Sequence, residues 1–334
     1  MEAAESSKAE ARSVQTATVA PTPAPDATQS GTPTPPLKAP IVEINELSLE
    51  LEKLRGTRVL TLLLPLDAAM GPQVVSDIYD TLLNSYSGTQ KLDVIVGSGG
   101  GDVDAAYGLA YILRRFAPEQ LTFIVPRWAK SAATLLVCAG DAILMGPPAE
   151  LGPLDPQIED PALGGGQFSP LSIQSTLNVL KELAAEGRID LCGVLTEKVL
   201  PLSLGEYLKS LDIAEDYVFR LLTSRMFKGE PECDHRAKTV ATKLSRGYTH
   251  HGHFISSGEA TSMGLKVAEP TDPEWRLIWR MWRIYERSEM ERMLKAAQEE
   301  HDRVAHPHLK RGPSRERGAG ETTHPGAMSR LSSN

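Results

Sequence analysis

The chain has 334 residues, 41% of them hydrophobic, and a formal net charge of −8 at pH 7, so we expect one large or two small globular domains. No stretch approaches the roughly 20 continuous apolar residues of a membrane span, and the N-terminus lacks the apolar core of a signal peptide, so we expect no transmembrane segment and a cytoplasmic protein. The moderate acidity argues against broad nucleic-acid binding, and three well-separated cysteines, Cys138, Cys192 and Cys233, fit reduced thiols better than disulfides.

Both ends of the chain are predicted to lie outside the folded part. Residues 1–40 are rich in Ala, Ser, Thr and Pro, and residues 301–334 are polar and Gly-rich. Neither segment has enough large apolar side chains to offset the entropy lost on ordering. We therefore predict disordered tails at 1–40 and 301–334, a domain at 41–270 and a C-terminal helix at 271–300.

Strand and helix patterns alternate through the first half of the domain, with short loops between them. Strands are predicted at residues 58–64, 92–96, 121–125 and 142–145. Helices are predicted at residues 73–86, 105–116 and 131–139. This alternation predicts a parallel sheet covered by helices, with a site formed by the loops that follow the strands.

The second half is predicted to be mostly helical. Helices are expected at residues 171–185, 204–227, 235–244 and 272–299. The first follows Gly164-Gly165-Gly166, so it is either a lid hinged on glycines or a peripheral helix. The last carries several tryptophans, so it either packs on the domain, which is the default, or forms part of a subunit interface.

Two motifs about 25 residues apart suggest an oxyanion site. In the first, a buried-strand pattern ends in Gly97-Ser98-Gly99-Gly100-Gly101 and enters a helix, so backbone N–H groups are exposed there. In the second, a strand is followed by Lys130-Ser131-Ala132 at the start of a helix, where unpaired N–H groups stabilise negative charge. The simpler interpretations are a glycine turn and a helix N-cap. Gly97-Ser98-Gly99 alone is a weak dinucleotide-binding signal, because the third glycine would fall at Asp102.

Together with Leu151-Gly152-Pro153-Leu154-Asp155-Pro156-Gln157, these motifs resemble the Clp-type serine peptidase superfamily, and within it the serine dehydrogenase proteinase family. The glycines at 99–101 stand where the superfamily has its oxyanion loop, and Ser131 stands at its nucleophile turn. The resemblance covers roughly residues 58–270. It implies an α/β fold of the ClpP/crotonase type, a parallel sheet of repeated β-β-α and βαβ units covered by helices, with helical C-terminal additions.

The resemblance also implies a catalytic triad. Serine needs a base and a group that orients the base, and the family supplies Ser131, Asp155 and a histidine that precedes an apolar residue and a helix ending in Gly-Leu. Anchoring on Ile255 places that histidine at His251, with His250 as the rival. The chain order Ser, Asp, His departs from the Ser, His, Asp order of Clp-type peptidases proper. The oxyanion donors are expected to be the backbone N–H groups of Gly100 and Ala132.

A lysine base, as in signal-peptide-peptidase-like relatives, is the alternative. Lys130 is adjacent to Ser131, but neighbours along a turn tend to point apart. Lys181 lies nearer the spacing that those relatives use. The histidine cluster at 250–253 and Cys233 lack the paired spacing of a zinc site, so no metal and no cofactor are expected.

We therefore predict an ATP-independent serine endopeptidase of the Clp-like superfamily that acts on peptide or protein substrates and forms a homo-oligomer. Three alternatives remain open: a Ser-Lys dyad peptidase, a catalytically inactive scaffold and a crotonase-type acyl-CoA enzyme. The last has the same paired N–H oxyanion hole but does not need Ser131.

Overall fold

The computed structural model describes residues 39–65, 67–86, 88–154, 158–159, 167–168, 170–189, 201–248 and 250–305. The chain divides into two units, residues 1–38 and residues 39–334. Every described residue belongs to the second unit. Within the described residues, no helix combines the length and the apolarity needed to cross a membrane.

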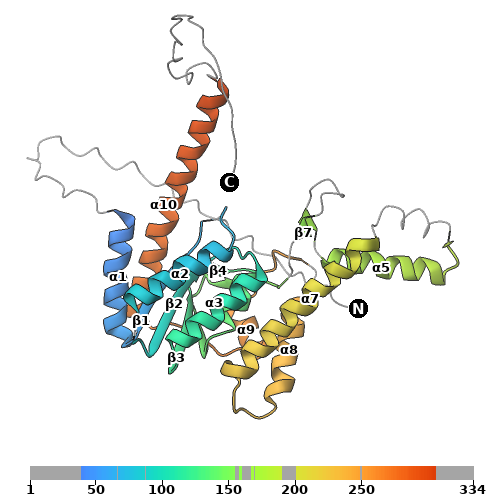
Figure 1. Cartoon of the computed structure of the whole chain (residues 1–334), viewed down its shortest axis with the longest axis horizontal. Helices are drawn as coiled ribbons and strands as arrows, with labels where there is room; N and C mark the ends of the chain where they lie inside the picture. Colours follow the sequence, from blue (N-terminus) through green and yellow to red (C-terminus); the bar gives the residue numbers. More distant parts are fainter. Residues whose placement is uncertain are drawn as a thin grey trace, which may run out of the picture. The chain divides into compact units, whose positions relative to one another are not determined.

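A five-stranded parallel sheet forms the centre of the second unit. Its strands are β1 (Arg58–Leu63), β2 (Lys91–Gly97), β3 (Gln120–Val125), β5 (Ala142–Met145) and β9 (Val267–Ala268), in the order β1-β2-β3-β5-β9. Helices α2 (Pro72–Ser85) and α3 (Val103–Phe116) connect the first three strands and lie against the sheet (Figure 1). The parallel α/β architecture predicted from the sequence is confirmed.

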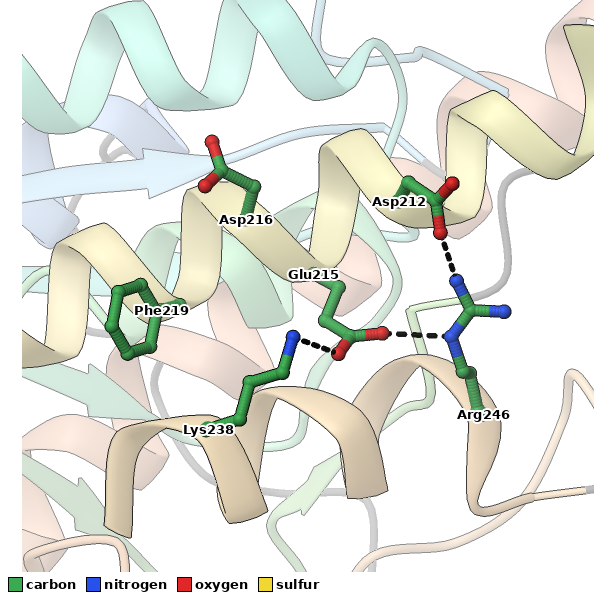
Figure 2. A pocket seen from close by; sticks show the side chains of 6 residues that line it. All are labelled: Asp212, Glu215, Asp216, Phe219, Lys238 and Arg246. Carbon is green, nitrogen blue, oxygen red and sulfur yellow. Dashed lines mark hydrogen bonds and ion pairs between the residues drawn. The ribbon is translucent and has the colours of Figure 1, made fainter. Parts of the chain in front are cut away.

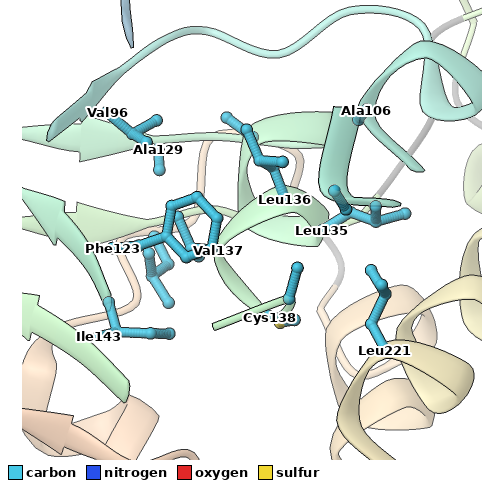
Figure 3. Close-up of a cluster of buried hydrophobic side chains, with 14 of the residues drawn as sticks. Val96, Ala106, Phe123, Ala129, Leu135, Leu136, Val137, Cys138, Ile143 and Leu221 are labelled. Atoms are coloured by element: carbon cyan, nitrogen blue, oxygen red, sulfur yellow. The ribbon is translucent and has the colours of Figure 1, made fainter. Parts of the chain in front are cut away.

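The larger core lies on the face of the sheet that these connecting helices cover. Alternate strand residues such as Val96, Phe123 and Ile143 point to this face and are fully buried. Helix α4 (Ala132–Val137) is buried at all six positions, and Figure 3 shows its side chains between the strands and Leu221. A helix with no exposed face cannot shift without opening the core, so the residue that precedes it is held rigidly.

Helices α1 (Pro40–Arg55) and α10 (Asp272–Ala305) pack against each other and cover the opposite face. Ile278 and Met281 of α10 are fully buried there with Ile95 of β2. The default expectation that the tryptophan-bearing helix packs within the chain is therefore correct. The sequence-based domain limits stay a prediction.

A buried ion-pair network fastens these two helices to the sheet. Asp93 of β2 is fully buried and accepts hydrogen bonds from the Arg55 guanidinium and, at 2.5 Å, from the Thr57 hydroxyl. Arg55 also donates to Glu274 of α10 at 2.5 Å. One guanidinium thus bridges α1, β2 and α10. Removing either partner of such a pair would leave a buried charge uncompensated.

The remaining described elements all lie between β3 and α10 in the chain. They are the short strands β4 (Trp128–Ala129), β6 (Glu150–Leu151), β7 (Ile158–Glu159) and β8 (Gln167–Phe168), and the helices α5 (Pro170–Ala185), α7 (Pro201–Leu221), the π-helical turn η2 (Leu222–Met226), α8 (Cys233–Arg246) and α9 (Ser257–Met263). Helix α4 begins one residue after the start of the predicted 131–139, because the backbone of Ser131 is not helical, and it ends two residues earlier, at Val137. The Gly164-Gly165-Gly166 run of the predicted lid lies outside the described residues.

Helix α10 also supports the strand that leads to Ser131. Trp282 is 1% exposed and packs edge-to-face against Trp128 of β4, with 4.8 Å between the ring centroids. A Cβ on Gly97 would lie 2.6 Å from the Trp282 ring, so glycine is needed where β2 ends. The packing of α10 therefore reaches the backbone next to both predicted motifs.

Candidate functional site

Ser131 occupies a strained turn between β4 and α4. Its backbone angles are φ 49° and ψ −121°, a combination that costs a non-glycine residue on the order of 1–3 kcal/mol. The residue is 8% exposed. It stands at the N-cap position, yet its side chain does not cap the helix. The hydroxyl is therefore not committed to the role that a simple N-cap would give it.

The glycine loop lies directly against this turn. Gly100 has φ 111°, and a Cβ built on it would lie 2.9 Å from the Cβ of Ser131 and 3.2 Å from the backbone nitrogen of Ala132. Gly101 has φ 144°, and its Cβ would lie 2.3 Å from the nitrogen of Met70. Met70 in turn donates its N–H to the carbonyl oxygen of Gly100 at 2.8 Å. The loop can approach Ser131 because Gly100 lacks a side chain, and it can approach the backbone of Met70 because Gly101 lacks one.

The two predicted oxyanion donors are thus neighbours. The N–H of Ala132 stands at the first turn of α4, where no intrahelical acceptor is available. The N–H of Gly100 donates to the hydroxyl of Ser98 at 3.1 Å, and Ser98 is fully buried. A substrate oxygen that took up the Gly100 donor would have to replace the Ser98 hydroxyl.

Thr134 fixes the loop after β6 beside the same turn. Its buried hydroxyl lies 2.7 Å from the carbonyl oxygen of Ala129 and 2.8 Å from that of Gly152, and it accepts the Gly152 N–H at 3.1 Å. Gly152 also donates to Ala129 at 3.1 Å. The segment at 151–154 is therefore anchored to the strand and helix that flank Ser131.

The histidine-bearing segment returns to this region through a strand-like bridge. Leu151 and Ile255 exchange backbone hydrogen bonds at 3.0 and 3.1 Å in antiparallel pairing, and Leu151 pairs with Ala129 through β6 and β4. Ile255 is thus two strand spacings, about 10 Å, from β4, the strand that precedes Ser131. The structure therefore brings the histidine-bearing segment back to the strands beside Ser131, although more than ninety residues separate them in the sequence.

The predicted bases lie in a turn just before Ile255. The His253 N–H donates to the carbonyl oxygen of His250 at 3.0 Å, which closes the turn. His250 is exposed and its Nδ1 accepts the N–H of Gly252 at 3.3 Å, whereas His251 is half-buried. Asp155 lies outside the described residues. Leu154, just before it, is 1% exposed and donates its N–H to the carbonyl oxygen of Leu244 at 2.8 Å.

The two lysines considered as bases are differently placed. Lys181 is exposed on α5. The Lys130 ammonium is 2.6 Å from Oε2 of Glu150 and lies among carbonyl oxygens. An ammonium in an ion pair has no lone pair to accept a proton from Ser131.

Sequence reasoning missed the partner of a third histidine. The ring of His253 packs against that of Tyr248 at a tilt of 34°, with 4.5 Å between centroids, and its Nε2 is 3.4 Å from Oε2 of Glu259. Tyr248 donates to the same carboxylate at 2.9 Å. The pKa of Tyr248 is raised, mainly by burial and to a smaller extent by this hydrogen bond. Ser256 caps α9 by accepting the Glu259 N–H at 3.2 Å. The spacing of Ser256 and Glu259, which is typical of a capping box, was the signal in the sequence that could have placed Glu259 in the first turn of a helix after the histidines.

A cavity of about 480 Å³ between α7 and α8 is a separate feature. Its central carboxylate, Glu215, is 7% exposed and accepts hydrogen bonds at 2.7 Å from each of Lys238, Thr242 and Arg246. Figure 2 shows the contacts with Lys238 and Arg246. Arg246 also pairs with Asp212. Glu215 of α7 is thus paired with two cations of α8, so the cluster joins two helices. Across the described part of the chain, no three His, Cys, Asp or Glu side chains gather to hold a metal ion.

Comparisons with known sequences add a family match. The profile of the family described as ClpP-like SDH-type serine proteinase matches residues 83–294. Two relatives come from Methanocaldococcus jannaschii. Uncharacterized protein MJ0137 is 29% identical over 178 residues, which are 53% of this chain and 54% of that protein. Uncharacterized protein MJ1495 is 26% identical over 227 residues, 65% of this chain and 69% of that protein. The chain therefore spans about half the length of the first relative and about two thirds of the second.

Solved structures were also found to be similar. ClpP1 from Listeria monocytogenes has 15% identity and a TM-score of 0.37, over 67% of this chain and 98% of that one. A variant of the 1510-N membrane-bound stomatin-specific protease, in complex with a substrate peptide, has 14% identity and a TM-score of 0.40, over 65% of this chain and 77% of that one.

Proposed function

The chain belongs to the family of ClpP-like SDH-type serine proteinases, and we propose that it is an ATP-independent serine peptidase with Ser131 as its nucleophile. The observation that carries the proposal is the turn at Ser131. A serine held at φ 49°, not used as a cap and placed against a glycine loop, has the local geometry that a nucleophile and a nearby oxyanion hole require.

In the proposed reaction, a histidine takes the Ser131 hydroxyl proton while Oγ attacks the carbonyl carbon of the scissile peptide bond. The charge that develops on the carbonyl oxygen is received by the N–H groups of Gly100 and Ala132. The imidazolium then protonates the departing amine, and a water molecule activated by the same base releases the acyl group from Ser131. Loss of one donor in such a hole typically costs ~2.7 to 4 kcal/mol of transition-state stabilisation.

We propose His251 as the base, with His250 as its rival and Asp155 as the orienting carboxylate. The pairing of Leu151 with Ile255 supports this assignment, because it returns the histidine turn to the strands beside Ser131. The ion pair of Lys130 with Glu150 argues against a neighbouring lysine as the base. Peptide or protein substrates and a second copy of this chain are the proposed partners.

Labelling with a serine-reactive fluorophosphonate tests the proposal. The full chain is incubated with the probe without ATP, digested, and the adduct is mapped by mass spectrometry. We expect the adduct on Ser131, none in Ser131→Ala, and hydrolysis of unstructured peptides by the unmodified chain alone. Peptide hydrolysis that persists at full rate in Ser131→Ala would refute the serine mechanism. Turnover of acyl-CoA thioesters in place of peptides would favour the crotonase-type alternative.

A further inference from the structure

The side chain of Lys130 links the nucleophile turn to the histidine turn. The backbone of Lys130 is itself fixed: its N–H donates to the carbonyl oxygen of Ser98 at 3.0 Å, and its carbonyl accepts the N–H of Ala133 at 2.9 Å. From this fixed base the ammonium reaches three acceptors, Oε2 of Glu150 at 2.6 Å and the carbonyl oxygens of Leu151 and His253, each at 3.3 Å. Three donors therefore meet three acceptors on two segments, the strand β6 and the turn that contains His253.

The path of the lysine stem is built into the neighbouring backbone. A Cβ on Gly152 would lie 2.5 Å from Cδ of Lys130 and 3.3 Å from its Cα, so the stem passes over a position that must lack a side chain. The Lys130 side chain is 19% exposed and that of Glu150 is 12% exposed. Arg127 also donates to Glu150 at 3.0 Å, so the Glu150 carboxylate forms ion pairs with both Lys130 and Arg127. An ion pair this sheltered is screened less by solvent than a surface pair.

The bond to His253 acts on the whole histidine turn. His253 closes that turn by donating to His250, and Ile255, two residues later, is bound to Leu151. We infer that Lys130 is a positioning residue: its ammonium clamps the turn at 250–253 beside Ser131 and thereby holds the base in place. This inference rests on the proposed function, and it gives the lysine next to the nucleophile a role other than that of a base.

The clamp is tested by substitutions of Lys130 that change the aliphatic part of its side chain and its charge separately. Lys130→Met keeps the stem and removes the ammonium, whereas Lys130→Arg keeps a cation that can bind Glu150 and a carbonyl oxygen. Lys91→Met, at an exposed lysine where β2 begins, is the matched control. We expect Lys130→Met to lower kcat roughly 10- to 100-fold with KM little changed, since a small misplacement of a catalytic group has such an effect, and Lys130→Arg to recover most of the loss. The pH profile of kcat should change in Lys130→Met only.

Hydrogen exchange supplies a readout that does not depend on catalysis. In Lys130→Met the backbone amides of His253 and Ile255 should exchange at least about tenfold faster, because the turn opens more often, while Lys130→Arg and Lys91→Met should match the unmodified chain. Unchanged exchange in Lys130→Met would overturn the clamp. A Lys130→Arg variant as inactive as Ser131→Ala, with normal exchange, would overturn it in favour of a lysine base. If Ser131→Ala proves active, the proposed function fails, yet the exchange result still decides whether Lys130 holds the turn.

Discussion

Gly100 lies so close to Ser131 that a methyl group on the glycine would come 2.9 Å from the serine Cβ. The contact joins the two motifs through residues that are 31 positions apart in the sequence, and it involves the residue that we propose as an oxyanion donor. We predict that Gly100→Ala lowers kcat/KM by about 10²- to 10³-fold, because the loop must retreat and carry its N–H away from the reacting oxygen. Steady-state peptide hydrolysis measures the effect.

Gly99→Ala is the matched control for this substitution. Gly99 is the preceding residue of the same loop, and a Cβ built there meets nothing within 4 Å. We expect its kcat/KM to stay within roughly threefold of the unmodified value, as for a surface substitution. Equal losses in both variants would mean that the loop tolerates no side chain for reasons unrelated to Ser131.

Ser131→Gly should stabilise the fold while it abolishes activity. Glycine adopts φ 49° without the strain of about 1–3 kcal/mol that a side chain brings there, and this gain exceeds the roughly 0.5–1 kcal/mol that glycine loses in entropy. We expect the free energy of unfolding to rise by about 1 kcal/mol in urea titrations. Ser131→Ala keeps the strain and should match the unmodified chain. A less stable glycine variant would show that the turn is not strained.

The sequence allowed the sheet and its order of elements to be predicted, because buried parallel strands and amphipathic helices leave periodic patterns. The proximity of Gly100 and Ser131 was also predictable, since both motifs follow neighbouring strands of one parallel sheet. The backbone conformation of Ser131, with φ 49°, could not be predicted from the sequence, because backbone angles in a turn depend on what packs around it.

The clamp of Lys130 on the histidine turn was not predictable for a related reason. Lys130 and His253 are separated by 123 positions, and a main-chain acceptor carries no residue signature. The ion pair of Lys130 with Glu150 depends on the pairing of β4 with β6, two strands of only two residues each. Such short strands lack the alternation by which longer strands are recognised.

Substitution of the proposed base and its rivals should show which residue activates Ser131. His251→Ala and Asp155→Ala are each expected to lower kcat by several orders of magnitude, and the double variant by little more than the worse single one, because triad members act as a unit. A histidine base would also make kcat/KM rise through neutral pH. Lys181→Met, at an exposed lysine of α5, should be nearly silent. Loss of activity in Lys181→Met, with His250→Ala and His251→Ala both active, would establish a Ser-Lys dyad instead.

The carboxylate of Glu215 should make the stability of the fold depend on pH. Burial alone would raise its pKa, but hydrogen bonds from Lys238, Arg246 and Thr242 lower the pKa from 4.5 to about 2. The ionised form therefore stabilises the folded chain above about pH 4.5, and the contribution is lost as the pH falls toward about 2. A shift of this size corresponds to at most about 3 kcal/mol.

We predict that Glu215→Gln destabilises the protein most above pH 5 and that the difference from the unmodified chain shrinks steadily as the pH falls from 5 toward 2. The glutamine has no charge and cannot form ion pairs with Lys238 and Arg246. In the unmodified chain, acid removes the same charge by protonating Glu215. Urea titrations at a series of pH values measure both curves. Asp216→Asn is the control, because Asp216 lies on the same helix in an exposed pair with Arg220 and should cost less than about 1 kcal/mol at any pH. A constant gap between the Glu215→Gln and unmodified curves from pH 5 to 2 would show that hydrogen-bond geometry, and not the charge of Glu215, joins α7 to α8.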